Sequence, residues 1–510
     1  MLVLLLTTIN QRYEHNILST FLPLTYILRK ASKHCTKMSS KENAAISNDN
    51  TERSQISSMV ALEMTSENAF KMTKFQIIKN LLVVSFGFLF LFTSFQSLSS
   101  VQSSHISYAL EEINSQVLDA AVIISCIFLP PATIALIGCK WTVAISMLCY
   151  IPYMVATLYD SWGMMLIAVI ILGLAVAPLW SAKCTYLTQV GVWYAKMTGT
   201  TKDDTINRFF GVFFMIFQTG QIWSNLILLT VFSERPVNST HQKSSEYYDP
   251  TVFLNYTNHD KPDMDKIYTA CRIYIGCAVV AFLIIAIFLD RIVMDMNEET
   301  KAKKICPYML ADTFKHFWRN HYQKLLVPLT IYSGFEQAFI AGDFILSYVS
   351  SALDFWNVGF VIICYGVVDA ACSFIFGLLV QHVGHIPFFV LAFIVHGGCQ
   401  ICMLLWTPDP DDMYIFYILA ALWGLGDAVI QTQINALYGF LFTDHTEAAF
   451  TNYRLWHSIG YLIAFRNRAS LITNLNLYLC LAFLCVGMFF YGVVEVAYRR
   501  SAKTSTERER

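Results

Sequence analysis

The sequence predicts an all-α membrane protein with twelve transmembrane helices arranged as two six-helix halves. Of its 510 residues, 55% are hydrophobic and only 14% are charged, whereas soluble domains carry roughly a quarter charged residues. Apolar runs recur from residue 79 to residue 497, each long enough for a helix to cross a hydrocarbon core about 30 Å thick. A long basic connection divides these runs into two sets of six.

Each predicted helix is an apolar run of about 20 residues, which is the length that spans a bilayer. The first half contains the runs 79–99, 117–137, 141–159, 163–187, 208–232 and 268–290, and the second half contains 324–350, 357–380, 386–406, 413–440, 449–470 and 475–497. Trp162, Trp356 and Trp406 stand at predicted ends, where an indole prefers the headgroup zone.

The distribution of Lys and Arg predicts the orientation. The short connections 100–116, 159–162, 351–356 and 407–412 contain neither residue. The inner segments, in contrast, hold Lys140, Lys196 and Lys202, seven Lys and Arg residues from Arg291 to Lys324, and five from Arg499 to Arg510. Because positive loops stay inside, both termini are expected in the cytoplasm of a multi-pass cell membrane protein. Residues 291–322 then form a cytoplasmic basic link, and residues 498–510 form a cytoplasmic basic tail.

The two halves span residues 75–290 and 323–497, and residues 1–74 precede them. This first stretch is rich in Ser, Asn, Lys and Glu and lacks apolar periodicity, so it predicts a disordered cytoplasmic arm or a gene-model extension. Within the first half, the polar outer loop 233–267 contains two glycosylation sequons, at Asn238 and Asn255. Glycan attachment is expected on this loop.

Short internal similarities support the division into halves. Leu172–Ala177 parallels Trp423–Ala428 at equivalent helices, and Gly87-Phe88 precedes Ser103-Ser104 by the same interval that separates Gly334-Phe335 from Ser350-Ser351. Parallel repeats of this kind are typical of the major facilitator fold, in which a central site lies between the halves.

Ionisable residues inside the predicted spans are candidates for function, because each costs at least ~2.5 kcal/mol to insert. A central polar cavity is predicted from one set of residues: Glu336, Asp343, Asp369, Asp427, Gln431 and Asn435, with Lys183 and Arg454 as possible partners of the acids. Asp427, Gln431 and Asn435 are four residues apart and share one helix face. The alternative is that the amides join packed helices, at ~0.6 kcal/mol each.

Two histidines in the spans are expected to be packed or interfacial. No carboxyl group or second histidine stands one helical turn from His396 or His457, so neither is predicted to relay protons.

Missing motifs narrow the function. The sequence has no phosphate loop, no zinc-protease or hydrolase motif and no potassium selectivity filter, so it predicts neither an enzyme nor a channel pore. The Cys399/Cys402 pair lies in an apolar run and predicts packing, so neither a metal nor a cofactor is expected. A net charge of -1 gives no attraction to nucleic acid.

Three segments resemble the homologue-A branch of the uncoordinated-93 family of major-facilitator-like proteins. They are APLWSAKCTYLT at 177–188, DAVIQTQINALYG at 427–439, and AAF with NYRLW within 448–456. The resemblance extends over residues 79–497. It implies a membrane protein that regulates a potassium channel as an accessory subunit, with a two-pore-domain channel as partner. A secondary transporter of a small solute or cation remains an alternative, as does a trafficking escort, since another branch escorts Toll-like receptors.

The sequence departs from the family pattern in one place, and two further features bear on transport. Arg466-Asn467-Arg468 interrupts the predicted eleventh helix, and two arginines are costly in a span unless they reach the headgroups. The loop Gly138-Cys139-Lys140 lacks the acidic and arginine residues of transporting relatives, and no charged residue occurs from Leu81 to Leu98. Both features favour regulation over transport.

Overall fold

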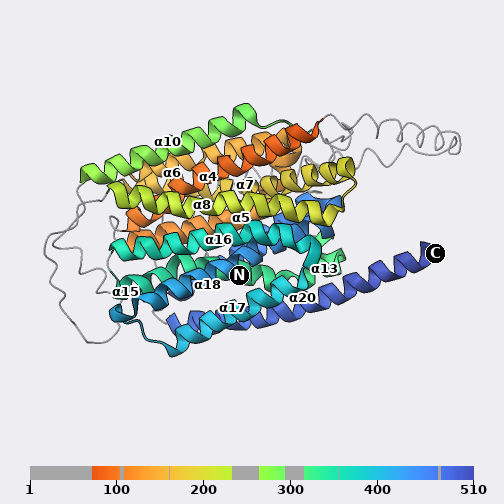
Figure 1. Ribbon diagram of the computed structural model, residues 1–510. Helices are drawn as coiled ribbons and strands as arrows, with labels where there is room; N and C mark the ends of the chain where they lie inside the picture. Colours follow the sequence, from red (N-terminus) through yellow and green to blue (C-terminus); the bar gives the residue numbers. More distant parts are fainter. Residues whose placement is uncertain are drawn as a thin grey trace, which may run out of the picture. The chain divides into compact units, whose positions relative to one another are not determined.

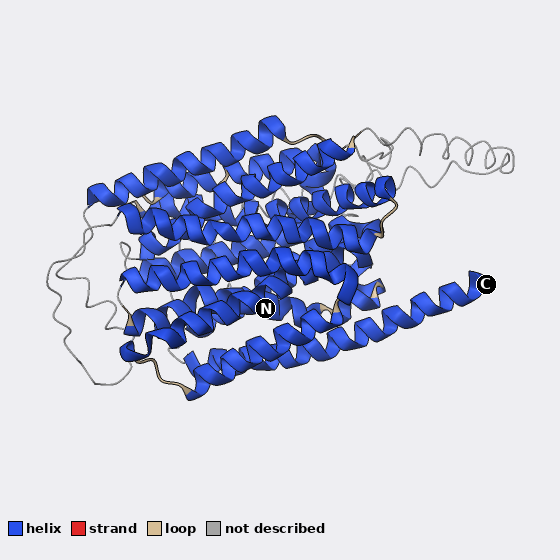
Figure 2. Cartoon of the chain, in the orientation of Figure 1, coloured by secondary structure: helices blue, strands red, loops and turns tan. Residues whose placement is uncertain are grey.

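The computed structural model describes residues 72–103, 108–159, 161–231, 264–292, 315–353, 355–468 and 473–509, and helices make up nearly all of them (Figure 2). Asn238, Asn255, most of the arm 1–74 and most of the link 291–322 lie outside these residues. In lipid, a helix satisfies its backbone hydrogen bonds internally. An all-helical fold is therefore the expected result of such an apolar chain.

The predicted first half contains six described helices (Figure 1). They are α4 (Lys74–Ser103), α5 (Tyr108–Leu148), α6 (Tyr150–Ala156), α7 (Trp162–Thr198), α8 (Lys202–Val231) and α10 (Met264–Phe288). Helix α5 packs along α7, and α4 packs against α8 and α10.

The predicted second half contains long helices and several short helical segments. They are α13 (His321–Leu325), α14 (Val327–Phe339), the π-helix η2 (Ile340–Val349), α15 (Ser350–Ala352), α16 (Phe355–Val383), α17 (Ile386–Leu405), η3 (Pro410–Asp412), α18 (Met413–Leu441), η4 (Thr443–His445), α19 (Thr446–Arg468) and α20 (Thr473–Glu509). The basic tail after residue 497 continues the helix α20 as far as Glu509.

Nine helices among the described residues are long and apolar enough to cross a membrane. One of them, 117–156, covers two predicted spans. Gly138 interrupts it with φ 76° and ψ 166°, a conformation that glycine adopts without a steric penalty. The helical path therefore breaks between the predicted second and third spans.

Two predicted spans are not among these nine helices. Residues 324–350 are divided among α13, α14 and η2, each shorter than a membrane crossing. The predicted span 449–470 corresponds to α19, which ends at Arg468 and carries Glu447, Arg454, Arg466 and Arg468. The helix continues through the Arg466 to Arg468 interruption, and the Arg466 side chain is exposed.

Glycines allow the closest helix crossings. A Cβ on Gly377 of α16 would lie 2.7 Å from the Cα of Gly211 on α8, so the two backbones touch there. A Cβ on Gly334 of α14 would overlap the backbone carbonyl of His457 on α19. These crossings hold α8 against α16, and α14 against α19, around the polar interior.

Candidate functional site

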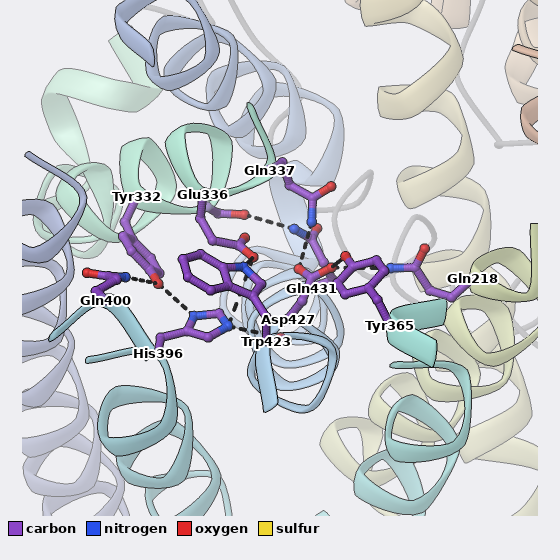
Figure 3. A network of polar contacts seen from close by, with 11 residues as sticks. Gln218, Tyr332, Glu336, Gln337, Tyr365, His396, Gln400, Trp423, Asp427 and Gln431 are labelled. Atoms are coloured by element: carbon purple, nitrogen blue, oxygen red, sulfur yellow. Dashed lines mark hydrogen bonds and ion pairs between the residues drawn. The ribbon is translucent and has the colours of Figure 1, made fainter. Parts of the chain in front are cut away.

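Three buried carboxyl groups meet where α14, α16 and α18 pack together, and Figure 3 shows two of them, Glu336 and Asp427. Glu336, Asp369 and Asp427 come from these three helices, and each has 0% of its surface exposed. Asp427 neighbours both of the other acids. Helix α18 approaches α16 closely because Gly424 has no side chain, and a Cβ there would lie 2.6 Å from the Tyr365 carbonyl oxygen. We call these three residues the acid cluster.

Asp427 accepts hydrogen bonds from three different helices. The amide of Gln337 donates to Oδ1 at 2.7 Å, and the hydroxyl of Tyr365 donates to Oδ2 at 2.5 Å. Gln218 of α8 donates to Oδ2 at 3.4 Å. Since a buried carboxylate is costly unless donors surround it, these bonds explain how Asp427 is tolerated in the interior.

Glu336 begins a second chain of polar contacts. The indole Nε1 of Trp423 donates to Glu336 Oε1 at 2.9 Å, and His396 Nε2 lies 4.0 Å from the same oxygen. The other ring nitrogen, Nδ1, lies 2.6 Å from the Tyr332 hydroxyl, to which Gln400 donates at 3.5 Å. Figure 3 shows this chain running from α17 through α14 to α18.

Two carboxyl oxygens of the acid cluster have no hydrogen-bond donor in the described part of the chain. They are Oε2 of Glu336 and Oδ2 of Asp369, although Ser373 donates to Oδ1 of Asp369 at 3.1 Å. Neighbouring carboxylates in a low-dielectric interior repel each other strongly. The arrangement is therefore suited to holding a proton between carboxyl groups or a small cation.

Of the remaining residues of the predicted cavity, Asp343 and Asn435 lie at separate contacts, whereas Gln431 also hydrogen-bonds to Asp427. Asp343 on η2 accepts a hydrogen bond from Asn476 of α20 at 2.9 Å. Asn435 accepts from Cys184 of α7 at 3.2 Å, and Gln431 donates to Ser333 of α14 at 3.3 Å. These residues join packed helices, as the structural alternative for the amides predicts.

The two cations lie beside aromatic rings and not beside the acids with which the sequence analysis paired them. Lys183 Nζ is 4.2 Å from the ring centre of Phe213 and 4.8 Å from that of Trp180. The guanidinium of Arg454 lies 5.1 Å from the same Trp180 ring. Within the described ranges, neither cation has a carboxylate within 4.0 Å.

Several residues of the polar network were not predicted from the sequence. Tyr332, Gln337, Tyr365 and Trp423 are ordinary residues for a membrane helix, and only the fold shows that they form hydrogen bonds with buried groups. His396 was judged by neighbours on its own helix, but its partners Tyr332 and Glu336 both belong to α14. The sequence alone does not show which residues of different helices face each other.

Solved structures with similar folds define the class of protein. The fucose:proton symporter from E. coli aligns with a TM-score of 0.56 and 13% identity, covering 82% of this chain and 99% of that chain. The proton:xylose symporter XylE aligns with a TM-score of 0.54 and 11% identity, covering 82% and 95%. Both are major facilitator superfamily proteins, so this chain is a multi-pass membrane protein with a major facilitator-like fold.

The chain belongs to the UNC-93 family. The family model described as "Ion channel regulatory protein UNC-93" matches residues 115–494. Protein unc-93 homolog A of Xenopus laevis is 43% identical over 84% of this chain and 96% of the relative, and the human homolog A is 40% identical over 82% and 93%. The "Putative potassium channel regulatory protein unc-93" of Caenorhabditis elegans is 32% identical over 83% of this chain and 61% of the relative. The resemblance stated from the three sequence segments is confirmed.

Proposed function

We propose that this protein is a non-enzymatic regulatory subunit of a potassium channel in the cell membrane, and that its partner is a two-pore-domain channel. The observation that carries the proposal is membership of the UNC-93 family, whose C. elegans relative is named as a potassium channel regulator. The regulator acts through helix contacts within the bilayer.

The proposed topology has twelve crossings in two six-helix halves, with both termini cytoplasmic. The break at Gly138 supports two crossings within 117–156, and α13, α14 and η2 together have the length of one more. Outer loop 233–267 then carries glycan. Glycosidase treatment should shift the mobility of the full chain, and the double variant Asn238→Gln/Asn255→Gln should abolish the shift.

A shallow apolar groove between α17 and α18 is the proposed contact face for a channel helix. It combines small residues on α17 with branched apolar residues on α18: Gly398, Cys399, Cys402, Ile415, Ile418, Leu419 and Leu422. Small residues let helix backbones approach closely in lipid. A Cβ on Gly398 would meet no atom within 4 Å, so the space beside it is open to a partner.

Co-expression with two-pore-domain channels tests this proposal. The protein should change the current or surface level of at least one channel, and Gly398→Leu should remove the effect by filling the groove. Gly276→Leu is the matched control, because Gly276 lies in α10 and also has no atom within 4 Å of an added Cβ. If neither the current nor the surface level of any tested channel changed, the proposal would be wrong.

A secondary transporter of a small solute or cation is the second candidate. It is favoured by the acid cluster, whose Glu336 Oε2 and Asp369 Oδ2 have no donor among the described residues. Uptake into vesicles should then depend on pH or on a cation, and Asp427→Asn should abolish it. Asp343→Asn is the control, since Asp343 contacts α20 outside the cluster. Uptake that survives Asp427→Asn would make the cluster structural.

A further inference from the structure

Two cationic side chains from different helices approach one indole ring. Lys183 of α7 and Arg454 of α19 lie 4.8 Å and 5.1 Å from the ring centre of Trp180, and α7 and α19 pack against each other. Lys183 has 0% of its surface exposed. Its Nζ and the Nε of Arg454 have no hydrogen-bond partner in the parts of the chain that the structure describes.

Aromatic rings replace the missing acceptors only in part. Phe213, Phe214 and Phe210 surround Lys183 Nζ at 4.2, 5.0 and 5.5 Å, in addition to Trp180. A cation over a ring face is attracted to it, but a ring accepts no charge-assisted hydrogen bond. An ammonium group removed from water normally has an anion or several acceptors beside it. Here no carboxylate of the described residues fills that position, and the thiol of Cys184 is the polar side chain beside the ammonium.

The acids of the interior are engaged elsewhere. Asp427 accepts from Gln337 and Tyr365, and Glu336 accepts from Trp423. Neither Lys183 nor Arg454 has a carboxylate within 4.0 Å among the described residues. The guanidinium Nη1 of Arg454 contacts Nδ1 of His457 at 3.4 Å. Its Nε and the Nζ of Lys183 therefore remain available to a ligand.

We propose that Lys183 and Arg454 form a binding site for a small organic carboxylate with an apolar body. The planar guanidinium fork of Arg454 matches a carboxylate, and Lys183 adds three N–H donors. Around Trp180, the rings of Phe88, Phe92 and Phe217 lie 5.5, 5.3 and 5.6 Å away and provide an aromatic wall for the ligand's body.

The site can be reached, because Trp180 and Arg454 each keep part of their surface exposed. It also joins α7 of the predicted first half to α19 of the predicted second half. A carboxylate that contacts both helices would stabilise the conformation in which they lie together. This inference goes beyond channel regulation and does not depend on it.

Ligand binding to the purified full chain in detergent tests the site. Sodium benzoate is the probe, benzamide is its uncharged counterpart, and sodium chloride tests an inorganic anion. Benzoate should raise the melting temperature and bind in titration calorimetry, whereas benzamide should do neither. Lys183→Met and Arg454→Gln should each weaken benzoate binding at least tenfold. Lys140→Met, at another lysine beside an indole (5.5 Å from the Trp141 ring), should leave it unchanged.

Four results would overturn the proposal. Equal binding of benzoate and benzamide would show that the charge is not recognised, and chloride binding as well as benzoate would exclude a carboxylate site. Absence of benzoate binding, or binding unchanged in Lys183→Met, would make Lys183 a structural amine. Lys183→Met is expected to fold, because it removes an uncompensated buried charge. Its melting curve, recorded in the same experiment, distinguishes loss of binding from loss of the fold.

Discussion

Substitution of Gly377 by alanine tests the backbone contact between α8 and α16. The new Cβ would lie 2.7 Å from the Cα of Gly211 and 3.2 Å from the carbonyl oxygen of Asn207. Because carbon atoms pack at about 3.5–4.0 Å, the helices must separate by close to 1 Å. Overpacking of this kind costs about 1–3 kcal/mol, while replacing a helical glycine by alanine returns about 0.5–1 kcal/mol. A net loss of about 1–2 kcal/mol is expected.

Thermal unfolding in detergent, followed by circular dichroism, measures this loss as a lower melting temperature. Gly398→Ala is the matched control, because its Cβ would meet no atom within 4 Å. Only the stabilisation from replacing a helical glycine by alanine applies there. If Gly377→Ala proved as stable as Gly398→Ala, the close crossing would be refuted.

Three further predictions concern buried polar groups. Tyr365→Phe removes the hydroxyl that donates to Asp427 and should lower the melting temperature by the equivalent of about 1.5–3 kcal/mol; an unchanged value would contradict the bond. Lys183→Met should raise the melting temperature of the ligand-free protein, because it removes an unpaired buried charge; a lower value would contradict this account. Burial lowers the pKa of His385 from its ordinary value near 6.5, so protonation favours the unfolded state, and stability should fall as pH drops below about 6.5. His385→Gln should reduce that pH dependence, and an unchanged slope would assign it to other groups.

Helix positions were predicted well where the apolar run is continuous. The predicted spans 386–406 and 413–440 correspond to α17 (Ile386–Leu405) and α18 (Met413–Leu441). Lipid requires each span to satisfy its own backbone, so an uninterrupted apolar run has few alternatives to a helix. The π-helix η2 was not predicted, because an i to i+5 bonding pattern leaves no mark on an apolar composition.

The acids of the candidate site were predictable, but their partners were not. Glu336, Asp369 and Asp427 could be selected because an ionisable residue in a span is costly. The same rule selected Lys183 and suggested an acid beside it, whereas the structure places Phe213 there. A buried charge indicates that an oppositely charged partner would be favourable. Which side chain actually lies beside it depends on how the helices are rotated and where they cross.

The contacts of Asp427 bear on the choice between the two proposed functions. Its bonds to Gln337 and Tyr365 are short and come from helices of the predicted second half, whereas the bond to Gln218 of α8 is 3.4 Å long and reaches the predicted first half. If the halves rock against each other, as in alternating access, the long bond is the one that breaks, and the acid cluster stays intact within its own half. Transport would then require Gln218 to separate from Asp427, which a contact-based regulator does not need. A cross-link that holds α8 to α18 near Gln218 and Asp427 should therefore block uptake of a solute. The same cross-link should leave the effect on the channel unchanged.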